Sequence, residues 1–289
     1  MAVDVNSNKY TFIFATVMVV VVATLLALAS ESLKPMQSEN VANEKRQNIL
    51  SSIGISVEAS AAKEAYEKYL VEAVVLDANG NVKETGLNAF DIDVLKDYKS
   101  GLSTIYKANA DDMEAMKAAL LAFGDGGVNY PLFVLNKDGQ DVYVVPVVGT
   151  GLWGPIWGYV TVAGDGKTVV GAVFDHKSET PGLGAEIKEA SFQKPFEGKT
   201  IFDEEGVFTG IKVMKGGAKG DAHGVDAISG GTITSNGVTE MLVRTLKIYE
   251  PYFLSLQAPA EVEVAIPDSL ALAMDSLNVE LLDTTVVDQ

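Results

Sequence analysis

A short segment rich in hydroxyl side chains and glycine carries the clearest chemistry in this chain. Between Asp226 and Val238 it holds the pair Gly230-Gly231 and four hydroxyls, those of Ser229, Thr232, Thr234 and Ser235. Hydroxyls and backbone amides in front of a helix bind phosphate well, because the helix dipole adds positive potential there. The segment therefore predicts a site for a phosphate group, which is either bound or covalently attached. The alternative is an ordinary glycine-rich loop that caps a helix.

An amphipathic helix is predicted directly after this segment. Spacings of three and four place its apolar residues on one face: Val238, Met241, Leu242, Leu246 and Tyr249. Ser235 or Asn236 is the expected N-cap, and Pro251 is the expected end of the helix.

The hydroxyl-rich segment resembles a known modification sequence. Asp226-x-x-Ser229-Gly230-x-Thr232 is similar to the flavinylation motif Asp-Gly-x-Ser/Thr-Gly-Ala-Thr, with Ala227 replacing glycine and Gly231 replacing alanine. In that family the last threonine forms a phosphoester with FMN. The resemblance implies that Thr232 accepts one covalent FMN per chain. It also implies a cradle for the phosphate made by Ser229, Gly230, Gly231, Thr234 and Ser235.

Two further segments indicate which member of the flavin-binding family this chain resembles. Residues 179–184, Glu-Thr-Pro-Gly-Leu-Gly, are similar to a segment shared by the Na+-translocating NADH:quinone reductase and the ion-translocating ferredoxin:NAD reductase. Residues 151–154, Gly-Leu-Trp-Gly, are closer to the C subunit of the quinone reductase. Independently of this, glycines on both sides of Leu183 predict that its side chain protrudes. The resemblance implies that the flavin ring or ribityl chain contacts Leu152, Trp153, Glu179, Thr180 and Leu183.

Composition points to chemistry supplied by a cofactor. The chain has no cysteine and only two histidines, His176 and His223, far apart in sequence, so no Fe–S cluster, metal site or catalytic residue is predicted. Gly164–Thr168 lacks the first glycine of a phosphate loop and predicts a hairpin turn. The formal charge of -17 disfavours nucleic acid as a partner.

The N-terminal region predicts a membrane anchor. Tyr10–Ala29 contains no charged residue and is long enough, as a helix, to cross the ~30 Å hydrocarbon core. Ala27-Leu-Ala29 would suit signal cleavage, but the apolar stretch exceeds a signal peptide's usual ~7–15 residues, which favours a retained helix. Lys34, Lys45 and Arg46 would place the large domain in the cytoplasm by the positive-inside rule. The family resemblance implies that the flavin domain lies in the periplasm instead, and we expect that orientation.

Strand and helix patterns predict an α+β fold, in which one transmembrane helix precedes an extramembrane FMN-binding domain of mixed strands and helices. Strands are expected at 71–76, 132–135, 142–148, 159–162 and 169–174, and helices at 38–51, 62–69 and 111–123. The expected organisation is a tail at 1–9, a transmembrane helix at 10–30, a membrane-proximal α/β part at 31–139, an FMN-binding domain at 140–257 and an acidic tail at 258–289.

The resemblance implies an electron-transfer role in a membrane enzyme. The chain would relay single electrons within a Na+-translocating NADH:quinone reductase of the inner membrane, with five other subunits as partners and a flavin transferase for maturation. One alternative is the flavin subunit of the ferredoxin:NAD reductase. The other is an anchored binding or scaffold domain that carries no flavin.

Overall fold

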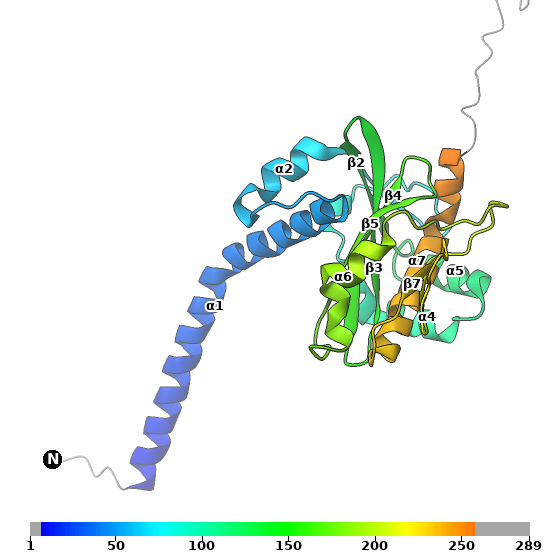
Figure 1. Ribbon diagram of the computed structural model, residues 1–289. Coiled ribbons are helices and arrows are strands. Elements are labelled where there is room, and N and C mark those ends of the chain that lie inside the picture. The colour runs from blue at the N-terminus through cyan, green and yellow to red at the C-terminus, as the bar shows by residue number, and fades with distance from the viewer. Residues whose placement is uncertain (1–6, 258–289) are drawn as a thin grey trace, which may run out of the picture.

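The computed structural model describes residues 7–257 and shows a mixed α+β fold (Figure 1). The expected tail at 258–289 and residues 1–6 lie outside the described part. The strands are β1 Leu70–Leu76, β2 Tyr130–Lys137, β3 Gln140–Thr150, β4 Pro155–Ala163, β5 Val169–His176, β6 Lys212–Met214 and β7 Gly224–Asp226. The α-helices are α1 Asn8–Ser52, α2 Ala62–Tyr69, α3 Val94–Asp97, α4 Ser103–Ala108, α5 Met113–Leu121, α6 Ala190–Gln193 and α7 Thr232–Gln257.

A five-stranded antiparallel sheet in the order β1-β2-β3-β4-β5 forms the centre of the molecule. All five expected strands are confirmed, although most are longer than the sequence patterns suggested. β6 and β7 form a separate parallel pair. Because β1 pairs with β2 and β2 pairs with β3, the sheet runs without a break across the expected boundary between residues 139 and 140.

The turn between β4 and β5 is the predicted hairpin. The Asp165 carboxylate accepts hydrogen bonds from the amides of Lys167 and Thr168, each at 2.8 Å, and from the Thr168 hydroxyl at 2.6 Å. Gly166 has a φ of +63° and lies so close to α7 that a Cβ would approach the Phe253 carbonyl oxygen to 2.5 Å. Both the backbone angle and the lack of space therefore require glycine there.

Helix α7 covers one face of the sheet. The five residues of its predicted apolar face are all fully buried, which confirms that prediction. They form one core with β2–β5, α5 and the 3-10 turns η4 Gly184–Lys188 and η5 Lys194–Phe196. Figure 1 shows α7 with α4 and α5 on one side of the sheet.

The opposite face is covered by α2 and the end of α1. Ile49, Leu50 and Ile53 are fully buried and share one apolar core with Phe133 and Val144, and α1 contacts β4 and β5. A buried hydrogen bond of 2.8 Å from the Thr161 hydroxyl to the Ser52 hydroxyl joins β4 to α1. The last turns of α1 therefore belong to the folded domain.

The rest of α1 extends away from the domain (Figure 1). The two helices expected at 10–30 and 38–51 form one continuous helix of 45 residues that contains Pro35. Proline removes one backbone hydrogen bond and bends a helix, in agreement with the bend along α1 in Figure 1. Among the helices of residues 7–257, α1 is the candidate that is long and apolar enough to cross a membrane.

Both predicted ends of the last helix were wrong. The helix begins at Thr232 because Gly231 already accepts a hydrogen bond from the Ser235 amide at 2.9 Å, so Ser235 and Asn236 lie inside the first turn. It continues through Pro251 to Gln257. Phe253 is fully buried against Tyr143, and this packing offsets the ~3 kcal/mol that a proline costs within a helix.

Candidate functional site

Thr232 is the first residue of α7, and its side chain is exposed. Within residues 7–257 its hydroxyl makes no hydrogen bond, and the backbone amides of Thr232, Ile233 and Thr234 have no partner either. These amides are those that a helix leaves unpaired at its N-terminus. An exposed hydroxyl beside unpaired amides at a positive helix end fits a phosphate ester on Thr232.

The glycine pair before Thr232 lies against the 179–184 loop. Gly230 has a φ of +75°, and a Cβ there would lie 2.7 Å from Leu183 Cδ2. A Cβ on Gly231 would lie 3.4 Å from the Leu183 carbonyl carbon. Two motifs that are about fifty residues apart in the sequence are therefore in direct contact, and the positive φ at Gly230 favours glycine there.

The four hydroxyls of the segment separate into two pairs. Ser229 and Thr232 are exposed, whereas Thr234 and Ser235 are each only 1% exposed. Thr234 donates to Glu179 Oε2 at 2.6 Å, and the Ser235 hydroxyl accepts the Ile228 amide at 3.2 Å. Both buried hydroxyls are thus occupied within the protein.

Glu179 is buried below the exposed hydroxyls and joins the loop of Trp153 to the first turn of α7. The side chain is buried, at 5% exposed, and Oε1 accepts the Trp153 amide at 2.7 Å while Oε2 accepts the Thr234 hydroxyl. Its own amide donates to His176 Nδ1 at 3.1 Å. His176, at the end of β5, thus helps to hold this loop.

Large apolar side chains on α7 and on the two loops linked to its start face solvent. Leu152 is 48% exposed, Trp153 64%, Leu183 41% and Ile233 56%. Leu183 protrudes as its flanking glycines predicted, and Thr180 is also exposed on the same loop. Ile233 was missed by the sequence analysis, although its position directly after Thr232 could have indicated it. A planar apolar ligand held at Thr232 would cover part of this surface.

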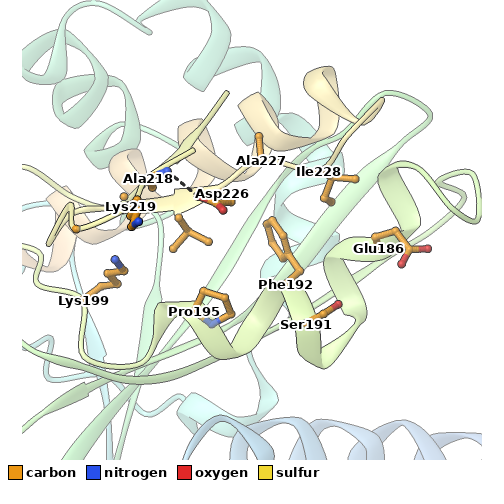
Figure 2. A pocket seen from close by; sticks show the side chains of 13 residues that line it. Glu186, Ser191, Phe192, Pro195, Lys199, Ala218, Lys219, Asp226, Ala227 and Ile228 are labelled. Carbon is orange, nitrogen blue, oxygen red and sulfur yellow. Dashed lines mark hydrogen bonds between the residues drawn. The ribbon is translucent and has the colours of Figure 1, made fainter. Parts of the chain in front are cut away.

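A cavity of about 440 Å³ lies nearby, at the start of the hydroxyl-rich segment. Figure 2 shows Phe192 and Pro195 on one side of it and Asp226 and Ile228 on the other. The Asp226 carboxylate accepts the Ala218 amide at 2.6 Å, which fixes the neighbouring loop. Thr232 does not line this cavity, so the exposed apolar side chains are the better surface for a group attached there.

Comparison with known proteins gives consistent matches. Residues 151–247 match the FMN-binding domain family. The chain is 34% identical over 244 residues to the C subunit of the Na+-translocating NADH-quinone reductase of Vibrio campbellii, covering 82% of this chain and 90% of that protein. The C subunit from Pasteurella multocida is 32% identical, covering 81% and 88%. The crystal structure of the C subunit from Parabacteroides distasonis is 39% identical, with a TM-score of 0.63, and covers 76% of this chain and 96% of that one.

The chain belongs to the family of C subunits of the Na+-translocating NADH-quinone reductase. It is therefore part of an enzyme complex, as the resemblance implied. This membership decides between the two membrane complexes in favour of the quinone reductase. The FMN-binding domain match supports FMN as the cofactor of this protein, and it contains all the exposed apolar residues named above. Together with α1, the family indicates that the protein is anchored to a membrane.

Proposed function

We propose that this protein carries one FMN covalently bound to the Thr232 hydroxyl and relays single electrons between partner subunits. The observation that carries the proposal is an exposed, unbonded hydroxyl at a helix start, with four exposed apolar side chains on that helix start and on the loops linked to it. When bound, FMN supplies the reversible uptake and release of electrons. The chain's own residues hold and orient the flavin and leave it open to partner proteins.

Attachment requires a flavin transferase and a flavin dinucleotide as donor. The Thr232 oxygen forms a bond to the phosphorus of the flavin phosphate, a nucleoside monophosphate leaves with the broken bond, and the hydroxyl loses its proton. The resulting phosphodiester carries one negative charge. The unpaired amides at the start of α7, together with Ser229, Gly230 and Gly231, would stabilise this charge.

The remaining residues of the proposed site form an exposed group and a buried group. Leu152, Trp153, Thr180 and Leu183 are exposed and would contact the ring or its ribityl chain. Thr234, Ser235 and Glu179 are buried with their polar groups occupied, so they would support the cradle from below. Ile233 would add one more apolar contact.

The setting of the protein is part of the proposal. One pass of α1 at residues 10–30 would hold the chain in the inner membrane, with the flavin domain in the periplasm. The continuous sheet supports treating 31–139 and 140–257 as parts that fold together, since both contribute to the apolar cores on its two faces. Five other subunits of an enzyme that oxidises NADH, reduces a quinone and exports Na+ would be its partners.

Mass spectrometry of the full chain, made together with an active flavin transferase, tests the attachment. We expect a gain equal to FMN minus water on the peptide that contains Thr232, and loss of that gain in Thr232→Ala. Ser255→Ala removes an exposed hydroxyl near the other end of α7 and serves as the matched control. An unmodified Thr232 peptide in the wild-type chain would contradict the proposal and favour the flavin-free scaffold.

A further inference from the structure

The buried Glu179 carboxylate joins three separate segments, two loops and the first turn of α7. One oxygen accepts the Trp153 amide, from the loop between β3 and β4, and the other accepts the Thr234 hydroxyl, from the first turn of α7. Glu179 itself belongs to the loop after β5, where its amide is held by His176. Each segment carries an exposed residue of the proposed flavin surface, which consists of Leu152, Trp153, Thr180, Leu183 and Ile233.

The space around the carboxylate is closely matched to it. A Cβ on Gly151 would lie 2.6 Å from Glu179 Oε1. A Cβ on Gly184 would overlap Oε2 and lie 2.5 Å from the Thr234 hydroxyl oxygen. The backbone at both glycines therefore lies close to the Glu179 side chain. Gly151 precedes Leu152 and Gly184 follows Leu183, both residues of the proposed flavin surface.

The Glu179 carboxylate is stabilised by hydrogen bonds and not by an ion pair. Among the ion pairs of residues 7–257, none includes Glu179. Burial of a carboxylate is costly, and here it is offset by two short hydrogen bonds and by its place beside the N-terminal turn of α7. An ionised carboxylate only accepts hydrogen bonds, so it can bind both the amide and the hydroxyl at once.

We propose that Glu179 is a positioning residue: it holds the Trp153 loop in register with the helix turn that carries Thr232, so that both the acceptor and the ring contact are pre-organised. This inference rests on the proposed attachment at Thr232. Glu179 acts through Trp153 and Thr234, and its buried negative charge opposes the negative charge that the flavin gains on reduction.

The first test measures FMN incorporation into full-length variants under equal transferase exposure. We expect at least tenfold slower incorporation at Thr232 in Glu179→Ala and Thr234→Val, and a rate near wild type in Thr234→Ser, which restores the hydroxyl. Glu179→Gln keeps the shape and loses the charge, so it should incorporate FMN and raise the flavin midpoint potential. Glu189→Gln, an exposed glutamate close in sequence, is the matched control.

A second measurement needs no flavin. Trp153 is mostly exposed, yet its amide is bound to a buried carboxylate, so its hydrogen exchange should be slow in the wild-type chain. We expect Thr234→Val, in α7, to speed the exchange of the Trp153 amide at least tenfold and Thr234→Ser to leave it slow. If Glu179→Ala does not fold, the comparison of Thr234→Val with Thr234→Ser still tests the positioning role of Glu179.

The outcomes separate this inference from the proposed function. An unmodified Thr232 peptide in the wild-type chain overturns both. A flavinylated wild type with wild-type incorporation rates in Glu179→Ala and Thr234→Val, and an unchanged potential in Glu179→Gln, overturns only the positioning role. Unchanged exchange of the Trp153 amide in Thr234→Val overturns it as well.

Discussion

Glu179 and Thr234 share a hydrogen bond of 2.6 Å although they are 55 residues apart in the chain. The bond joins a loop that follows the sheet to the first turn of the last helix. Thr232, the proposed flavin acceptor, lies only two residues from Thr234. The position of the acceptor therefore depends on a side chain from another part of the sequence.

The space around this bond predicts the effect of a single added methyl group. Gly184→Ala should destabilise the fold by about 1–3 kcal/mol, because the new Cβ would overlap the Glu179 carboxylate and crowd Thr234. Gly86→Ala is the control, since nothing lies within 4 Å of a Cβ there. Thermal unfolding of the two variants measures the difference, and equal midpoints would contradict the close packing described here.

Trp153 should affect the flavin without affecting the fold. Its side chain is 64% exposed, so Trp153→Ala should change the free energy of unfolding by no more than about 0.5 kcal/mol. Flavin emission should increase in the same variant, because an indole against the ring quenches it. Trp157→Phe, in β4, is the comparison. Emission that rises only in Trp157→Phe would place the flavin on another surface.

The hairpin carboxylate predicts a pH dependence of stability. Burial acts to raise the pKa of Asp165, but the hydrogen bonds from Thr168 and Lys167 outweigh it and hold the pKa below its usual value. Because the folded-state pKa is depressed, this contribution to stability is present above the unfolded pKa of ~3.9 and is lost as pH falls through the folded value.

Asp165→Asn tests this dependence. The variant should unfold at a lower temperature than wild type at pH 7, and the gap should narrow as the pH falls below about 4. Melting curves across the pH range measure it. A gap that stays constant down to the lowest pH would show that the charge of Asp165 does not contribute.

The hydroxyl pair that joins α1 to the sheet predicts a coupled effect. Ser52→Ala should cost about 1–3 kcal/mol, because it leaves the buried Thr161 hydroxyl without its partner. Adding Thr161→Val should recover part of that loss, since the Thr161 hydroxyl is then no longer left unpaired, although the Ile49 carbonyl still lacks its hydrogen bond from Ser52. A double-mutant cycle measured by denaturant unfolding gives the coupling, and strictly additive effects would show that the two hydroxyls do not interact.

Much of the fold could be predicted because its signals are local. Alternating and continuous apolar runs located the five strands, and the spacing of apolar residues located the buried face of α7. The ends of α7 could not be located in this way. Its start depends on the turn at Gly230 and on contact with Leu183, and its continuation past Pro251 depends on the burial of Phe253.

The sequence by itself determined which residue types are available for flavin attachment and which family the motifs resemble, because both depend only on side-chain chemistry and spacing. It did not distinguish Thr232 from Thr234 by accessibility. Only the tertiary structure decided that one is exposed and the other bonded to Glu179. The reason is that residues two apart on a helix face different directions, and loops distant in sequence determine which direction is buried.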